Sequence, residues 1–308
     1  MSQLVSVVIP AYNSEATLAR SIESALRQSY RPLEILVVDD CSTDGTSRIA
    51  EGFAARGVRL VRLERQSGAS GARNAGIEAA DGDLVAFLDS DDEWLPSKIE
   101  KQVALFATDE RITLVSCAAN VISSSGRDLG DIYGGHRPTT GPDAWKALLA
   151  TNFIATPTVL ARRRQLLEAG SFDPRLKIGE DQDMWIRLAM RGNVAYISEV
   201  LVLVHIREKS LSNTRFEDQL QYTLPMIRRH IANAGDRLDK QADRKIMGER
   251  LHRLGRGACN SGLYWQGLRM MAQSMAYGHR PLQGVMFLIT AAPPVQWLKR
   301  LLRSRLAA

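Results

Sequence analysis

The sequence has few cysteines and no long apolar run, and both absences exclude classes of protein. Its three cysteines are far apart, so neither a metal-binding spacing nor a disulfide framework emerges, and a reducing cytosol is the expected compartment. No stretch reaches the roughly 18 to 20 apolar residues that a membrane-spanning helix needs. The best candidate, residues 282–292, ends at two prolines. The start lacks the basic and apolar regions of a secretory signal. We therefore expect a cytoplasmic protein, with peripheral attachment to the inner face of the plasma membrane left open.

The composition is that of an ordinary globular chain. Of its 308 residues 45% are hydrophobic and 24% are charged, which excludes a disordered protein and allows one large or two modest domains. The net charge is +6. This moderate basic excess is compatible with nucleic acid, an anionic membrane or phosphorylated substrates, and charge alone does not choose among them.

The first hundred residues alternate between strand and helix patterns. We expect buried strands at 4–9, 34–38, 58–61 and 84–88, with amphipathic helices between them. This alternation predicts an α/β fold with a mostly parallel sheet flanked by helices. Further on we expect strands at 114–122, 156–160 and 194–204, an irregular loop at 127–142, and helices at 163–169 and 183–190. From residue 215 the pattern is helical, so the expected division is a domain at 1–214 and a C-terminal helical module at 215–308.

The most informative feature is the fourth strand, which runs directly into Asp89, Asp91 and Asp92. In open α/β sheets ligands bind at the carboxyl ends of the strands. Carboxylates gathered there suit Mg²⁺ or Mn²⁺ that also touches a phosphate. The alternative interpretation is a solvated acidic turn before the next helix.

Three other motifs follow strands or open helices at the same expected rim. Asp40 offers only hydrogen-bond acceptors, which suits the imide N–H of a uracil ring. Tyr12 supplies an aromatic face for a base, and Arg73 supplies a cation for a diphosphate. Taken singly, Tyr12 is better read as a packing residue and Arg73 as a surface cation, and Asp40 is open to interpretation as part of a helix cap. Together with the acidic cluster they predict one nucleotide-binding rim.

A fifth motif, at 179–185, places acids at the start of an amphipathic helix. One interpretation is stabilisation of the helix dipole. The other makes Asp181 a general base, because neighbouring acids raise the proton affinity of a carboxylate.

In their order and spacing, these motifs resemble the family 2 glycosyltransferases of the GT-A fold, a resemblance that covers roughly residues 4–215. It implies a nucleotide-sugar donor, a divalent cation (Mn²⁺ or Mg²⁺) and inversion at the anomeric carbon. By motif position, Asp40 meets the nucleobase, Asp89 the ribose, Asp91 the metal on the diphosphate with Asp92 close by, and Asp181 is the base. The residues that carry the resemblance or its implied contacts are Pro10, Tyr12, Asn13, Asp40, Arg73, Asn74, Asp89, Asp91, Asp92, Glu180 and Asp181.

One departure concerns a histidine that the family often carries before a Ser-x-Ser pattern. Here the position holds Arg207, and His205 lies two residues earlier. We favour Arg207 as a direct contact to the diphosphate, because a guanidinium pairs well with phosphate. For His205 a packed strand residue is the preferred interpretation.

The C-terminal module carries two apolar patterns. Tyr264, Trp265, Leu268 and Met271 form a candidate stripe, of the kind that usually lies between helices. Residues 285–305 combine apolar side chains and a tryptophan with cations, which favours an anchor on an anionic membrane over a helix packed on the domain. With this reading, the basicity needs no nucleic-acid partner.

The sequence thus predicts an inverting, metal-dependent transferase that moves a sugar from a nucleotide sugar, most simply a UDP-sugar, to a hydroxyl of a glycan or lipid-linked acceptor in bacterial surface polysaccharide synthesis. The alternative is a catalytically inactive nucleotide-sugar-binding scaffold at the membrane, supported by Arg207 and opposed by intact Asp91 and Asp181. Two other enzyme classes are disfavoured. An aspartyl-phosphate phosphatase would carry its acid pair on the first strand, whereas here the pair follows the fourth strand. A dinucleotide-binding reductase would show Gly-x-Gly-x-x-Gly after the first strand, and that motif is not present there.

Overall fold

The computed structural model describes residues 3–135, 138–206 and 216–278. The chain forms two compact units. The first comprises Met1–Leu148 and Asn152–Asn213, and the second comprises Leu149–Thr151 and Thr214–Ala308. Arg207 and the tail at 285–305 lie outside the described residues, so the interpretations placed on them remain predictions.

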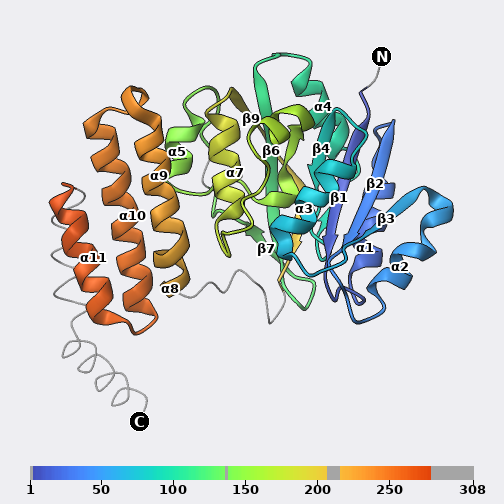
Figure 1. Ribbon diagram of the computed structural model, residues 1–308, viewed down its shortest axis with the longest axis horizontal. Coiled ribbons are helices and arrows are strands. Elements are labelled where there is room, and N and C mark those ends of the chain that lie inside the picture. Colours follow the sequence, from blue (N-terminus) through green and yellow to red (C-terminus); the bar gives the residue numbers. More distant parts are fainter. Residues whose placement is uncertain (1–2, 136–137, 207–215, 279–308) are drawn as a thin grey trace, which may run out of the picture. The chain divides into compact units, whose positions relative to one another are not determined.

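The first unit is built on one sheet of nine strands, with the order β3-β2-β1-β4-β8-β6-β9-β5 and with β7 paired to β6 (Figure 1). The strands are β1 Val5–Ala11, β2 Leu33–Asp39, β3 Val58–Arg62, β4 Leu84–Phe87, β5 Glu93–Trp94, β6 Ile112–Ile122, β7 Asp128–Asp131, β8 Leu160–Arg162 and β9 Asn193–His205. Pairs among β1 to β4 are parallel, as is the pair of β6 and β9, whereas β8 runs antiparallel to both β4 and β6. The fold is thus a mixed, mostly parallel sheet flanked by helices.

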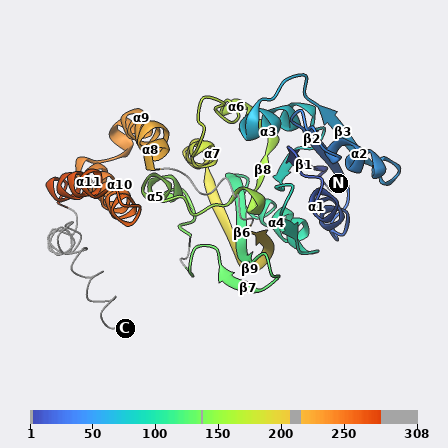
Figure 2. The ribbon, with the colours of Figure 1, turned by 90° about the horizontal axis from the view of Figure 1, so that it is seen from below.

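Helices cover both faces of this sheet, with α1 and α4 on one side and α3 and α6 on the other (Figure 2). The helical elements are α1 Leu18–Leu26, α2 Thr46–Gly52, η1 Ala54–Arg56, α3 Gly68–Ala79, α4 Lys98–Phe106, α5 Ala144–Ala150, η2 Thr156–Thr158, α6 Arg163–Glu168 and α7 Glu180–Ala189. In β1, Val7 and Ile9 belong to the core shared with α1 and α4, while Val8 faces α3. A Cβ added at Gly76 of α3 would lie 2.2 Å from Val8 Cγ1, so glycine is needed where α3 packs on the strand.

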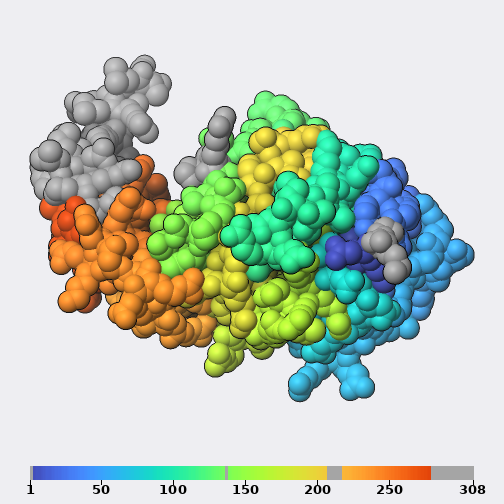
Figure 3. All heavy atoms as spheres, turned by 90° about the horizontal axis from the view of Figure 1, so that it is seen from above, coloured from blue at the N-terminus to red at the C-terminus, as the bar shows by residue number. Residues whose placement is uncertain are grey.

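The parallel register brings the expected motifs to one edge of the sheet. Ala11 pairs with Asp39, and Val8 pairs with Phe87. The segments that follow β1, β2 and β4 therefore leave the sheet side by side, and their polar residues line a common rim. At the end of the strand order, β5 pairs with β9, and Leu95 N donates to Leu201 O at 2.9 Å. The teal and yellow segments that contain these residues lie next to each other in Figure 3.

Two expectations about the middle of the chain were wrong. The segment 156–160 is not one strand, because η2 occupies Thr156–Thr158 and β8 begins only at Leu160. Pro157 cannot donate a ladder hydrogen bond, which explains the 3₁₀ turn. The region 127–142 also contains the short strand β7, in a hairpin closed by Ser123 N donating to Arg127 O at 2.9 Å. Its aspartates and glycine are residues that strands disfavour, so no strand pattern is visible there in the sequence.

The described part of the second unit is helical. Its elements are α8 Phe216–Asp218, the π-helical η3 Gln219–Thr223, α9 Leu224–Ala234, η4 Gly235–Arg237, α10 Lys240–Asn260 and α11 Tyr264–Ala276. Helices α10 and α11 pack closely through Gly255, where an added Cβ would lie 2.8 Å from Gly267 O. In the same unit, Arg250 Nε donates to Leu149 O at 2.7 Å. Across the ranges that the structure describes, no helix is both long and apolar enough to cross a membrane.

The expected apolar stripe on α11 needs correction. Met271 is fully buried, but Trp265 is 75% exposed. Residues 264, 268 and 271 follow one another at four and three positions and share a helix face, whereas residue 265 lies about 100° around the helix from residue 264, at the margin of that face. Trp265 therefore contributes no core packing within this unit.

A buried lysine at the start of α4 leads to a prediction about stability. Lys98 has no exposed surface. Its Nζ lies 3.9 Å from the centre of the Trp94 ring and 2.8 Å from Gln102 Oε1. Burial lowers the pKa of Lys98 to about 7, and burial raises the pKa of the nearby Cys117 thiol to about 12. Between pH 7 and 10 the unfolded chain therefore binds more protons than the folded chain at this position.

We therefore expect the free energy of unfolding of the wild type, measured relative to Lys98→Met, to increase as pH rises. Urea denaturation of both proteins at pH 6 and pH 9.5 measures this difference, and a rise of about 2 to 4 kcal/mol is expected. The Met variant serves as the reference because every other titrating group is common to both proteins. A difference that stays constant with pH would show that Lys98 does not titrate in this range.

Candidate active site

The acidic turn after β4 is held by side chains of α1. Thr17 Oγ1 donates to Ser90 O at 2.8 Å, Ser21 Oγ donates to Asp92 O at 2.7 Å, and Arg20 Nη2 donates to Asp91 O. Because these backbone carbonyls already have donors, the turn has a fixed course at the end of the strand. The predicted acids at this rim are therefore presented by a rigid backbone.

Asp92 is the buried member of the acidic cluster. It is 3% exposed, and its Oδ1 accepts a hydrogen bond from His205 N at 3.0 Å. Burial and the neighbouring charges of Asp89 and Asp91 raise the pKa of Asp92 well above its usual range. Asp92 therefore ties the acidic turn to the end of β9 rather than presenting an open carboxylate.

Arg73 of α3 joins two of the predicted motifs. Its side chain is 7% exposed, with Nη2 3.0 Å from Asp89 Oδ1 and Nη1 3.1 Å from Glu180 Oε1. The guanidinium also lies over the Phe172 ring, 5.5 Å from its centre. A charge-assisted pair at each end of one planar group fixes both carboxylates in position. The end of β4 and the start of α7 are thus held together, and the predicted contact of Arg73 with a diphosphate stays a prediction.

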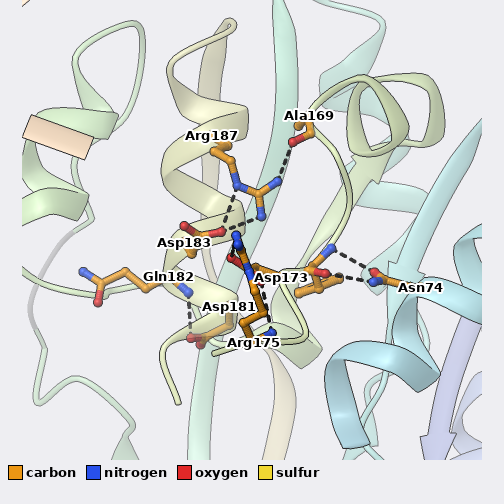
Figure 4. Close-up of polar contacts among 9 residues, drawn as sticks. Asn74, Ala169, Asp173, Arg175, Asp181, Gln182, Asp183 and Arg187 are labelled. Atoms are coloured by element: carbon orange, nitrogen blue, oxygen red, sulfur yellow. Dashed lines mark hydrogen bonds and ion pairs between the residues drawn. The ribbon is translucent and has the colours of Figure 1, made fainter. Parts of the chain in front are cut away.

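Asp181 lies in the first turn of α7, which follows Gly179 with φ of 76°. Its Oδ1 accepts from Gln182 N at 2.6 Å, as Figure 4 shows, and its Oδ2 accepts from Asn152 Nδ2 at 2.9 Å. Burial and the adjacent Glu180 charge raise the pKa of Asp181 to about 6. A carboxylate with a pKa just below neutrality is well matched to taking up a proton.

The position of α7 is secured by polar contacts around Asp181 (Figure 4). Asp183 has no exposed surface, and Arg187 binds it through Nη2 at 2.6 Å and Nε at 2.9 Å. Arg187 Nη1 also donates to Ala169 O at 2.6 Å. Asn74 of α3 exchanges two hydrogen bonds of 2.8 Å with the backbone of Phe172. These contacts fix the helix that carries Asp181 and the segment that leads to it.

The loop after β1 and the loop after β2 are joined to each other by hydrogen bonds. Asn13, with φ of 47°, accepts at Oδ1 from Thr43 N at 2.8 Å, and its own N donates to Ser42 Oγ at 3.0 Å. Tyr12 is 46% exposed. Pro10 is the second-last residue of strand β1, just before this loop. The structure thus presents an open aromatic ring on a loop whose backbone is fixed, which suits the predicted contact with a base.

Asp40 directly follows the C-terminal end of β2 and is buried, with 3% of its surface exposed. Its two carboxylate oxygens accept backbone hydrogen bonds from Ser67 N at 2.6 Å and Gly68 N at 2.8 Å. In the structure, Asp40 therefore fixes the start of α3 through these two hydrogen bonds. Each carboxylate oxygen has a second acceptor position, so the predicted hydrogen bond from a nucleobase is chemically compatible and stays a prediction.

A hollow of about 430 Å³ opens beside Ser67, whose backbone N–H donates to Asp40. Its lining is formed by the segment between β3 and α3, namely Arg62, Leu63, Glu64, Arg65 and Ser67. No functional motif falls in this segment, because its mixed, mostly polar residues are typical of any exposed loop.

The acids at the rim offer oxygen ligands for a divalent cation that also contacts a diphosphate. Across the described residues, no group of three or more His, Cys, Asp or Glu side chains is placed to hold a metal ion. Asp89 is 30% exposed with one oxygen engaged by Arg73. Carboxylate oxygens of Asp89 and Asp91 nevertheless suit Mg²⁺ or Mn²⁺, which take their remaining ligands from phosphate and water. The donor chemistry therefore fits a metal that arrives with a diphosphate.

His205 is mainly a packed residue of β9. Its ring is 18% exposed, and Nε2 lies 3.8 Å from Glu93 Oε2. Burial and the charge of Arg20 lower the pKa of His205. His205 binds the acidic turn through its backbone N–H, which donates to Asp92 Oδ1, and not through its ring.

Three residues of the site were missed by the sequence analysis. Asn152 contacts Asp181 directly. Phe172 packs edge-on against Phe87 and Trp185, with ring centres 5.4 and 5.7 Å away. Burial and then the charge of Asp181 raise the pKa of Tyr133. A single asparagine or aromatic residue in a loop carries no periodic signal, so these residues could be found only from the structure.

The architecture is that of the GT-A transferases. The sequence profile described as "Glycosyl transferase family 2" matches residues 6–170, and the chain belongs to this family and is a glycosyltransferase.

Relatives with curated descriptions align over about 70% of the chain. The chain is 32% identical over 217 residues to a putative teichuronic acid biosynthesis glycosyltransferase, TuaG, of Bacillus subtilis, covering 70% of this chain and 83% of the relative. It is 31% identical to WfgD of Escherichia coli, a UDP-Glc:alpha-D-GlcNAc-diphosphoundecaprenol beta-1,3-glucosyltransferase, covering 70% of this chain and 82% of that protein.

Solved structures show the same fold at lower identity. Staphylococcus aureus TarS 1–349 in complex with UDP-GlcNAc superposes with a TM-score of 0.69 at 22% identity, covering 90% of this chain and 81% of that chain. The mannosyltransferase PcManGT of Pyrobaculum calidifontis, in complex with GDP-Man and Mn²⁺, gives a TM-score of 0.61 at 21% identity, covering 96% and 82%.

Proposed function

We propose that this glycosyltransferase moves a sugar from a UDP-sugar to a hydroxyl of a glycan or lipid-linked acceptor, with inversion at the anomeric carbon, in bacterial surface polysaccharide synthesis. The observation that carries the proposal is the Arg73 bridge, which holds the acidic end of β4 next to Asp181 at the start of α7. The proposed donor-binding residues at the end of β4 and the proposed base, Asp181, are thereby held close together. The description of WfgD supports a lipid-linked acceptor, and that of TuaG supports a role in surface polysaccharide synthesis.

The reaction follows from these positions as a direct displacement. The Asp181 carboxylate takes the proton of the acceptor hydroxyl, whose oxygen attacks the anomeric carbon on the face opposite the diphosphate. The bond from that carbon to the diphosphate oxygen breaks, and the electron pair leaves with the nucleoside diphosphate. The sugar is then joined to the acceptor, and the proton resides on Asp181.

The donor is held by the loops that end β1, β2 and β4. Tyr12 stacks on the base, Asp40 accepts from its imide N–H, and Asp89 contacts the ribose. Asp91 and Asp89 would hold Mn²⁺ or Mg²⁺, which would supply positive charge for the departing diphosphate. In this proposal residues 1–214 form the transferase domain and residues 215–308 form a helical module, which meets an anionic membrane surface on the cytoplasmic side.

An assay of UDP release tests the proposal. The purified chain is incubated with Mn²⁺ and a synthetic GlcNAc-diphospholipid acceptor, and with UDP-glucose, UDP-GlcNAc, UDP-galactose or UDP-glucuronate in separate reactions. Acceptor-dependent release of UDP from one of these donors is expected, with the sugar found on the lipid by mass spectrometry. UDP binding without product from any donor would favour the inactive scaffold instead.

A further inference from the structure

Asn152, in the connection between α5 and η2, has an amide group whose orientation is fixed at both ends. Its Nδ2 donates to Asp181 Oδ2 at 2.9 Å, and its Oδ1 accepts from Ile154 N at 3.2 Å. Turning the amide over would break both hydrogen bonds. The side chain is therefore set with its donor toward the carboxylate.

The chain leading to Asn152 is also held by α7. Gln182 donates its backbone N–H to Asp181 Oδ1 at 2.6 Å, and its Nε2 donates to Leu148 O near the end of α5. Gln182 is 3% exposed. One residue thus fixes the second oxygen of Asp181 and, through α5, the start of the connection that carries Asn152. Each carboxylate oxygen receives one N–H from a different direction.

The charged groups around Asp181 act in opposite directions. Burial and Glu180 of α7 raise its pKa, while the Gln182 N–H, Arg73 of α3 and the Asn152 amide lower it. Tyr133 lies near enough for the Asp181 charge to contribute to the rise in its own pKa. Of the groups that favour the carboxylate, the amide of Asn152 is the uncharged side chain, and it can be removed without losing an ion pair.

We propose that Asn152 is a positioning residue for transfer, which orients the Asp181 carboxylate and keeps it in its charged form while the acceptor hydroxyl approaches. The inference rests on the proposed role of Asp181 as base. Asn152 itself contacts neither the donor nor the reacting atoms in this arrangement.

Asn152→Asp is the sharpest variant, because it keeps the Oδ1 acceptor for Ile154 N and replaces the donor with a second carboxylate oxygen. The acidic limb of the pH–rate profile, expected near pH 6 in the wild type, should move upward by about one pH unit or more. Transfer at pH 6 should then fall about fivefold or more, while the rate approaches the wild-type rate above pH 8. Asn152→Ala should shift the limb in the same direction by a smaller amount.

Asn193→Asp is the matched control. Asn193 Nδ2 donates to Asp109 Oδ2 at 2.8 Å at the start of β9, the opposite edge of the sheet from the rim. This variant loses the same kind of hydrogen bond and should leave the pH profile unchanged. Thermal unfolding and UDP binding of all variants are measured in parallel, and donor KM is expected to stay within about twofold of the wild type.

The outcomes separate this inference from the proposed function. A pH profile of Asn152→Asp that matches the wild type, with transfer intact in both, overturns the role of Asn152 alone. A fall in rate that is equal at every pH and accompanies loss of UDP binding also overturns it, because that is the result of a structural role. No transfer by the wild type with any donor would overturn the proposed function.

Discussion

Replacement of Asp181 by asparagine is expected to reduce transfer by about 10³-fold while UDP binding stays within about twofold of the wild type. The amide has nearly the same shape as the carboxylate but cannot accept the acceptor's proton at neutral pH. Asp181 is placed for this role by Gln182 N and Asn152 Nδ2, which bind its two oxygens. Measurement of kcat with saturating donor, together with calorimetric titration of UDP, separates chemistry from binding.

Asp109→Asn provides the control for this change. Asp109 is an aspartate paired with Arg111 and located at the turn before β6, on the edge of the sheet opposite the rim. Its substitution should leave kcat unchanged. If Asp181→Asn retained wild-type kcat, Asp181 would not be the base, and another group near α7 would have to take the proton.

Replacement of Arg73 by methionine is expected to be the second largest perturbation. Methionine fills much of the same volume but leaves Asp89 and Glu180, which are 30% and 19% exposed, facing each other without the cation between them. Removing one partner of a buried ion pair commonly costs about 3 to 5 kcal/mol. Because both carboxylates retain some contact with solvent, we expect a loss of about 2 to 3 kcal/mol in the free energy of unfolding.

Transfer by Arg73→Met should fall about 100-fold or more, because the acidic turn and α7 no longer keep their separation. Urea denaturation gives the stability, and the UDP-release assay gives the rate. Arg73→Lys keeps the charge but cannot span both carboxylates as a planar group, so it should recover stability more than rate. A methionine variant with wild-type stability and rate would show that the bridge is not needed.

The sheet and its rim were predictable because they depend on local patterns. The apolar runs at 84–88 and 35–38 indicated buried strands, and the parallel register then places Asp40 and Asp89 on the same edge of the sheet. The segment 156–160 was misjudged because its β-branched residues favour a strand, whereas Pro157 and tertiary contacts impose a 3₁₀ turn.

The partners of the predicted site residues were not predictable. Asp40 was expected to face a nucleobase, and the structure shows it first binding the backbone at Ser67 and Gly68. Arg73 was expected near a diphosphate, and it also bridges two carboxylates. Such contacts join segments up to 113 positions apart in the chain, and no sequence periodicity records them. Asn152 belongs to the same class.

Calorimetric titration of UDP into the wild-type chain, with and without Mn²⁺, tests the central claim most directly. If the rim of β1, β2 and β4 is a site for a nucleoside diphosphate with a cation on Asp91 and Asp89, UDP should bind, and Mn²⁺ should strengthen the binding about tenfold or more. Absence of UDP binding under both conditions, or an affinity that Mn²⁺ leaves unchanged, would contradict a metal-dependent UDP-sugar transferase.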